Sequence, residues 1–158
     1  MKRILTTALL LVMFVASYAQ FEKGKKYVGA YTTGLGLSYS SGDKLRFSLG
    51  AEGGYFIADN FMVKANAGYE HTRHADDFSF GLGGRYYFQQ NGIFLGAGGE
   101  YVHHDPSNND VLIPVEVGYA FFLNRYVTIQ PALYYKMSIN DFSDGSTVGL
   151  KIGLGFYF

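Results

Sequence analysis

The sequence contains no cysteine and only three prolines, and both shortages narrow what the chain can be. Without cysteine it forms no disulfide and carries no cysteine-linked lipid anchor, so an exported form must draw its stability from other interactions. After residue 20, no apolar run approaches the ~20 residues that a membrane-spanning helix needs. What the sequence has in plenty is 21 glycines, 14 tyrosines and 14 phenylalanines, a composition that favours an all-β domain.

An excess of charge of one sign is missing as well. Lysine plus arginine and aspartate plus glutamate each number 13, so the formal net charge is zero. Loss of Lys2 and Arg3 with a leader would leave 11 basic and 13 acidic side chains. No basic field exists to attract a phosphate backbone, and we therefore expect no nucleic-acid partner.

The N-terminus has the three parts of a secretory signal. Lys2 and Arg3 form a basic start, residues 4–16 are mostly apolar, and Ser17-Tyr18-Ala19 offers a small-x-small cleavage site before Gln20. The alternative, a transmembrane helix, needs a longer apolar run than this one. We therefore expect a cleaved signal peptide at residues 1–19 and one β-barrel domain at residues 20–158.

Residues 147–158 alternate strictly between two kinds of side chain. Val148, Leu150, Ile152, Leu154, Phe156 and Phe158 are apolar, and the residues between them are small, polar or charged apart from Tyr157. A period of two predicts a β-strand with two chemically different faces. The strand reaches the last residue of the sequence and places an aromatic side chain there.

Seven more segments alternate in the same way. They span residues 26–40, 45–57, 61–73, 78–89, 93–102, 111–123 and 126–139. Tight turns are expected at residues 58–60, 90–92 and 124–125, and longer polar loops at residues 40–44, 74–77, 103–110 and 140–145. Short turns at one end and longer loops at the other predict an eight-stranded antiparallel up-and-down transmembrane β-barrel.

The chemistry of the two faces distinguishes a membrane barrel from a soluble one. A lipocalin-like barrel has an apolar interior, whereas an eight-stranded membrane barrel has room inside mainly for small and polar residues. We therefore expect the large apolar residues to face lipid, with two aromatic girdles. One girdle would contain Tyr27, Tyr55, Tyr86, Phe88, Tyr119, Phe121 and Phe158, and the other Tyr39, Tyr69, Tyr101 and Tyr135.

Two further features bear on the backbone of such a barrel. An unpaired sheet edge in hydrocarbon costs several kcal/mol for each unsatisfied group, so the last strand must pair with the first. Pro114 and Pro131 fall inside predicted strands, where proline removes a hydrogen bond of the ladder, and we expect a bulge or local distortion at each.

Charged residues in the predicted strands share the inward face. They are Arg46, Glu52, Lys64, Glu70, Arg85, Glu100, Glu116, Lys136 and Lys151, five basic and four acidic. Because isolated charges in a narrow lumen are costly, we expect them to pair. Counting across the hairpins places Glu52 diagonal to Lys64 and predicts a belt Arg85–Glu100–Glu116–Lys136. Such a network is either a plug of ion pairs or a polar conduit.

Other chemistry is weakly indicated. His71, His74, His103 and His104 lie in or beside the predicted loops, without the spacing of a known metal site. We predict no metal, no cofactor and no catalytic residues. No serine lies in register with these histidines to act as a nucleophile. The His-x-Ser arrangement of barrel deacylases is missing.

The signal, the eight alternating strands, the inward charges and the terminal Phe158 together resemble the OmpX/OmpA-like family of small outer-membrane β-barrels. The resemblance implies a place in the outer membrane of a Gram-negative bacterium, in contact with its lipid and lipopolysaccharide, and we expect a monomer. It also implies that the barrel assembly machinery recognises the last strand through Phe158, with Phe156 and Leu154 on the same face. Three roles stay open: a closed structural or surface-interaction barrel, a narrow pore for small solutes, and a lipid-modifying barrel enzyme.

Overall fold

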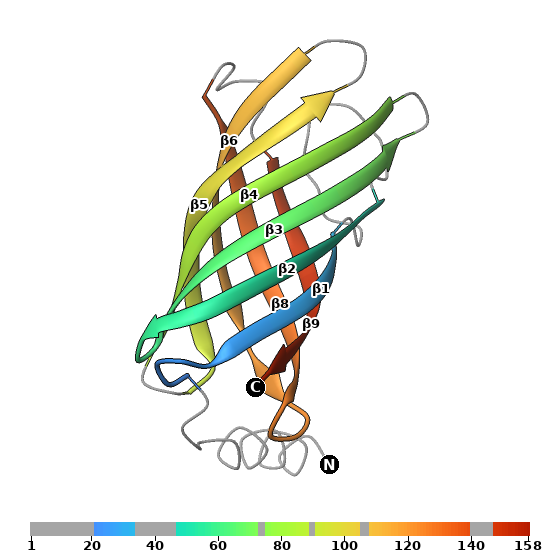
Figure 1. Ribbon diagram of the computed structural model, residues 1–158. Helices are drawn as coiled ribbons and strands as arrows, with labels where there is room; N and C mark the ends of the chain where they lie inside the picture. The colour runs from blue at the N-terminus through green and yellow to red at the C-terminus, as the bar shows by residue number, and fades with distance from the viewer. Residues whose placement is uncertain (1–20, 34–46, 73–74, 89–90, 105–107, 140–146) are drawn as a thin grey trace, which may run out of the picture.

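One antiparallel β-sheet forms the whole of the described protein. The computed structural model describes residues 21–33, 47–72, 75–88, 91–104, 108–139 and 147–158. The strands are β1 Lys26–Thr33, β2 Phe47–Ala58, β3 Phe61–Thr72, β4 Ala75–Tyr87, β5 Ile93–His104, β6 Asn108–Tyr119, β7 Phe121–Phe122, β8 Val127–Ser138 and β9 Thr147–Tyr157. The two-residue β7 continues β6 beyond Ala120 and pairs with the same neighbour, β8. The nine segments therefore make eight continuous barrel strands, which are called staves, tilted around one axis (Figure 1).

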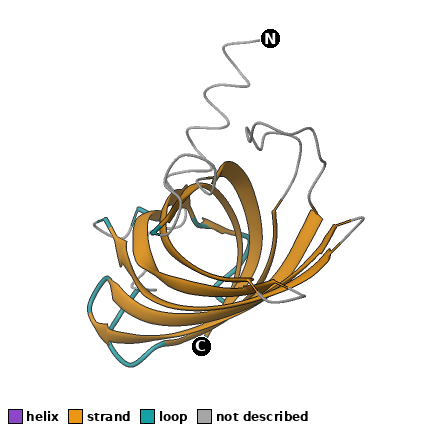
Figure 2. Ribbon diagram, turned by 90° about the horizontal axis from the view of Figure 1, so that it is seen from above, coloured by secondary structure: helices purple, strands orange, loops and turns teal. Residues whose placement is uncertain are grey.

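The sheet closes on itself. Each stave pairs with the next along the chain, and β1 pairs with β9 from Tyr27 opposite Tyr157 to Thr33 opposite Lys151. The view along the axis shows the resulting ring of strands (Figure 2). A closed ring leaves no unpaired edge, as a barrel in hydrocarbon requires. The predicted eight-stranded antiparallel barrel is confirmed, including the pairing of its last strand with its first. Among the described residues, no helix is long and apolar enough to cross a membrane.

The two ends of the barrel differ in their connections. The end at which β2 turns into β3 is called the short-turn end, and there Asn60 takes a positive φ of 64° beside an irregularity in the ladder between Phe56 and Ala58. The opposite end is called the loop end. The loops predicted at residues 74–77 and 103–110 are wrong in extent, because β4 already begins at Ala75, β5 continues to His104 and β6 begins at Asn108. The backbone at this end stays paired in the ladder although many of its residues are polar.

The prolines produce local distortion without a bulge. Between β5 and β6 the pairing lapses opposite Pro114, between Ala97–Val115 and Glu100–Leu112, and resumes in the same register. Between β6 and β8 it lapses opposite Pro131, where β6 gives way to β7 at Ala120. Each proline keeps its place in the ladder on the other side, with Lys136 and Ile152 respectively. The missing proline N–H therefore interrupts the pairing with one neighbouring strand and leaves the pairing with the other intact.

The outer surface is apolar between two ends that carry aromatic residues. Leu49, Val63, Leu82, Leu95, Val117, Leu133 and Leu154 are among the exposed large side chains, all with outward parity. Tyr55, Tyr86, Phe88 and Phe158 are exposed toward the short-turn end, and Tyr69, Tyr101 and Tyr135 toward the loop end, whereas Tyr119 and Phe121 are half-buried. Tyr39 lies outside the described residues. Phe158, Phe156 and Leu154 all face outward.

The expected outward position of Tyr27 is wrong. Tyr27 is only 1% exposed, whereas Val28 beside it is exposed, so the face of β1 with the larger side chains points into the barrel. The glycines around Tyr27 explain this orientation. A Cβ on Gly29 or on Gly155 would lie 2.4 Å from atoms of the Tyr27 ring or hydroxyl, so the missing side chains make the space that the ring fills.

Large side chains also fill the lumen near the short-turn end, contrary to the expectation of a small and polar interior. Six rings pack together there and are called the aromatic cap: Phe21, Phe56, Tyr87, Phe94, Phe122 and Tyr157. Phe56, Tyr87 and Phe94 are fully buried. The lumen therefore changes along its axis from an apolar end to a charged centre.

Candidate functional site

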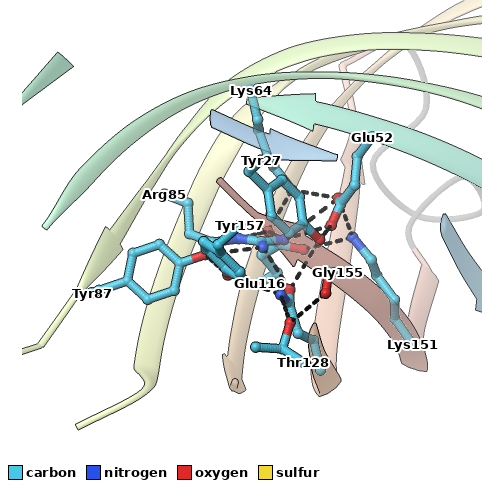
Figure 3. Close-up of polar contacts among 11 residues, drawn as sticks. Tyr27, Glu52, Lys64, Arg85, Tyr87, Glu116, Thr128, Lys151, Gly155 and Tyr157 are labelled. Carbon is cyan, nitrogen blue, oxygen red and sulfur yellow. Dashed lines mark hydrogen bonds and ion pairs between the residues drawn. The ribbon is translucent and has the colours of Figure 1, made fainter. Parts of the chain in front are cut away.

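Five charged side chains meet in the middle of the lumen. Glu52 from β2, Lys64 from β3, Arg85 from β4, Glu116 from β6 and Lys151 from β9 form what is called the central charge cluster (Figure 3). Alternation places each of them on the inward face of its strand, and each is at most 9% exposed. Five of the eight staves are thus linked by side chains across the lumen.

Arg85 lies at the centre of this cluster. Its Nη2 and Nε donate to Oε1 of Glu116 at 2.7 and 3.0 Å, and Nη2 lies 3.3 Å from Oε1 of Glu52. Its guanidinium carbon lies 4.2 Å from the centre of the Phe94 ring. A planar guanidinium suits this position because it donates in two directions within its plane while a ring covers its face.

The two lysines complete the neutralisation of the carboxylates. Lys151 Nζ donates to Oε2 of Glu52 at 3.0 Å and to Oε2 of Glu116 at 3.1 Å. Lys64 Nζ donates to Oε1 of Glu116 and lies 3.4 Å from Oε2 of Glu52. Each carboxylate therefore contacts all three cations, which offsets the large desolvation cost of burying five charges. The cluster contains one cation more than it has carboxylates.

A layer of neutral side chains joins the cluster to the aromatic cap by hydrogen bonds. The Tyr27 hydroxyl donates to Glu52 at 2.6 Å, and Arg85 Nη1 donates to Gln130 Oε1 at 2.9 Å. Gln130 Nε2 in turn donates to Thr128 Oγ1 at 2.8 Å and to the Tyr157 hydroxyl at 2.9 Å. Sequence reasoning did not select these neutral residues. The inward parity of Thr128 and Gln130 was the available signal.

A second ion pair lies apart from the central charge cluster. Lys136 Nζ donates to Oε1 of Glu100 at 2.7 Å, and the Lys136 side chain is 28% exposed. Tyr134 lies beside this pair, its ring centre 5.8 Å from Lys136 Nζ. Nearer the loop end, the Ser138 hydroxyl donates to Asp110 at 3.0 Å. This part of the lumen is therefore polar, and its cation Lys136 is partly exposed.

The observed partners differ from the predicted belt. Arg85 contacts Glu52 and Glu116 rather than Glu100, and Lys136 contacts Glu100 rather than Glu116. The belt assumed contacts between neighbouring strands along the sheet, but these long side chains reach strands that lie two places away around the ring. Arg46 and the Glu70 side chain lie outside the described part of the structure. The other seven predicted charges all line the lumen.

The histidines do not form a described site. The side chains of His71, His74 and His104 lie outside the described residues, and His103 is exposed on β5. Among the described residues, no three His, Asp or Glu side chains come together as metal ligands would.

Two glycines on the inward face of β9 give a test of packing around the neutral layer. A Cβ on Gly155 would lie 2.4 Å from the Tyr27 ring and 2.6 Å from Gln130 Nε2, whereas one on Gly153 would meet its nearest atom at 3.6 Å. We expect Gly155→Ala to lower the free energy of unfolding by about 1–3 kcal/mol through overpacking. Urea titration of the folded barrel in lipid vesicles measures this loss. The matched variant Gly153→Ala should change stability little, and equal losses in the two variants would contradict the packing seen around Tyr27.

Solved structures with the same fold include bacterial outer-membrane barrels. The N-terminal β-barrel domain of Pseudomonas aeruginosa OprF matches with a TM-score of 0.68 at 14% identity, over 86% of this chain and 98% of that one. The Yersinia pestis outer membrane protein Ail matches with a TM-score of 0.59 at 11% identity, over 86% and 100%. P. aeruginosa OprG matches with a TM-score of 0.56 at 15% identity, over 87% and 97%. No protein-family model and no curated protein sequence matches the chain. At these identities the likeness shows the fold of the chain and leaves its activity open.

Proposed function

We propose that this chain is an integral outer-membrane β-barrel, closed by its own charged side chains, with a structural or surface-interaction role in the bacterial envelope. The central charge cluster is the observation that carries the proposal. Its five side chains come from strands around the ring and are at most 9% exposed, so they occupy the cross-section of the lumen rather than its wall. Water-filled channels, by contrast, occur in barrels of about 16 strands or more.

The outward face supports the membrane part of the proposal. Among the described outward side chains of the strands, Lys26 and His103 are the only ones that are basic or acidic, and they lie at opposite ends of the barrel. Lipid and lipopolysaccharide are the partners that fit this apolar band, because a charge in its middle would cost several kcal/mol. Lipid alone can cover this apolar band without a second protein. We therefore propose that the protein is a monomer.

The proposal assigns no catalytic activity to the barrel. The carboxylates of the central charge cluster are each engaged by three cations, and Glu100 is engaged by Lys136. A general acid or base needs access to a substrate proton, and these groups contact each other instead.

Single-channel recording in planar lipid bilayers tests closure. The parent protein should give no stable conductance steps, since moving an ion past the central charge cluster means breaking several buried ion pairs at once. A large porin incorporated under the same conditions is the positive control. Steady conductance by the parent, altered when Lys136→Met removes the partly exposed cation, would instead establish a narrow pore.

A further inference from the structure

We infer that small molecules enter the lumen only from the loop end. The segment just before β1 closes the short-turn end with the Phe21 ring, and this closure can open locally. The segment comprises residues 21–25 and is called the N-terminal strap. This inference goes beyond the proposed function, because a one-ended lumen follows from the packing of the strap and not from the role of the barrel. It rests on three observations: the position of Phe21, the way the strap is held, and the difference in burial between the two halves of the lumen.

Phe21 is the one residue of the aromatic cap that does not belong to a strand. Its ring stacks on Tyr87 with centres 4.0 Å apart and planes 15° apart, and meets Tyr157 edge-on at 5.7 Å. It also lies 5.6 Å from Phe122. Although it precedes β1, Phe21 is only 1% exposed. A residue outside the sheet is thus buried as deeply as the core.

Among the described residues, the hydrogen bonds that join the strap to the barrel all go to residues 56–60, whereas a strand of the closed sheet has a neighbour on each side. The Asn60 N–H donates to the Phe21 carbonyl at 2.7 Å, and the Gly24 N–H donates to the Phe56 carbonyl at 2.8 Å. The Phe56 N–H donates to the Lys25 carbonyl at 2.9 Å. Gly24 has a φ of 93°, a left-handed conformation that glycine adopts without steric cost. The Lys23 N–H donates to the Asp59 carboxylate at 2.9 Å, in an exposed position. Local opening of a terminal segment that is bonded on one side only costs less than unfolding the barrel.

The two halves of the lumen differ in burial. Toward the short-turn end, the inward side chains of Phe56, Met62 and Phe94 are fully buried. Toward the loop end, Tyr31, Asn66 and Ser79 face inward and are half-buried, although Val102 and Ser138 in the same half are buried. On this inference, a small hydrophilic molecule reaches Ser79 from the loop end, whereas the aromatic cap blocks the opposite approach.

Engineered single cysteines test this arrangement directly, because the sequence has no cysteine of its own. Ser79→Cys places a thiol in the half-buried region, and Ala120→Cys places one beside the aromatic cap, where Ala120 is 2% exposed. Each folded variant is treated in detergent micelles with a small cationic methanethiosulfonate, and labelling is followed by mass spectrometry. Ser79→Cys should react at least about tenfold faster than Ala120→Cys, and adding Phe21→Ala should raise the rate at Ala120→Cys by about tenfold or more.

Phe88→Ala is the matched control, because Phe88 is an outward aromatic residue at the same end and lies outside the cap. It should leave the Ala120→Cys thiol slow. A heat-induced shift in gel mobility checks that each variant is folded. If Phe21→Ala does not fold, Phe21→Leu replaces it, with a smaller rise expected. Fast labelling at Ala120→Cys with Phe21 in place, slow labelling at Ser79→Cys, or no rise in a folded Phe21 variant would each overturn the inference.

Discussion

Replacing Glu116 by glutamine should lower the free energy of unfolding by about 3–5 kcal/mol, the usual cost of removing one partner from a buried ion pair. Glu116 accepts hydrogen bonds from Lys64, Arg85 and Lys151. Glutamine keeps the shape of the side chain but removes its charge, and its amide nitrogen would face cations. Three buried positive charges would then share Glu52 alone.

Urea unfolding in lipid vesicles measures the loss, with gel mobility or circular dichroism as the signal, because the protein has no tryptophan to report by fluorescence. Glu100→Gln is the matched control. Its partner Lys136 is 28% exposed and can regain water, so the loss should be clearly smaller. Adding Lys151→Met to Glu116→Gln should recover part of the stability. Equal losses for Glu100→Gln and Glu116→Gln would show that the central charge cluster is not the structural core of the lumen.

Phe158→Ala should remove most of the folded barrel from the outer membrane of cells, if Phe158 is the position that the assembly machinery recognises. The Phe158 ring is 58% exposed and faces outward, so it is available to a partner before lipid surrounds it. Its backbone pairs with Lys26 through N–H to carbonyl bonds of 2.7 and 3.0 Å, and these bonds do not depend on the ring. Assembly in cells and stability in isolation are therefore expected to separate.

Two measurements distinguish recognition from stability. Heat-modifiable protein in outer-membrane fractions should fall several-fold for Phe158→Ala, whereas spontaneous refolding of the same variant into micelles should match the parent. Phe88→Ala removes an outward ring at the same end of the barrel, but not in the last strand, and should assemble normally. Normal levels of Phe158→Ala in outer membranes would remove the assigned role of this residue.

The strands could be predicted because a period of two is the direct imprint of a pleated sheet between two solvents. Residues 61–73 and 147–158 match β3 and β9 to within a residue at each end. Residues typical of tight turns likewise predicted the connections at the short-turn end. The loop end was less certain in outline, because polar residues such as His103 and Asp77 occur both in loops and in strands that extend beyond an apolar band.

The contents of the lumen could be predicted only in part. Parity along a strand separates its faces, and that placed Arg85 and Glu116 inside. It does not say which face is inside when aromatic residues alternate with small ones, as in β1, and there the glycines of neighbouring strands decide. Nor does it give partners across the barrel, because the contact between Lys64 on β3 and Glu116 on β6 crosses a lumen whose width depends on the number and tilt of all the strands.

The pairing between β1 and β9 also determines the order in which the barrel can form. Its hydrogen bonds join residues from opposite ends of the described chain, Tyr27 to Tyr157 and Thr33 to Lys151. Not one of them can form until β9 has been synthesised, so the first strand emerges from the ribosome long before its second neighbour exists. Through that interval Val28, Leu49 and the rest of the outward band have neither lipid nor a finished ring around them. The contacts between the strands most distant in sequence therefore form late, and the meeting of the first strand with the last completes the barrel.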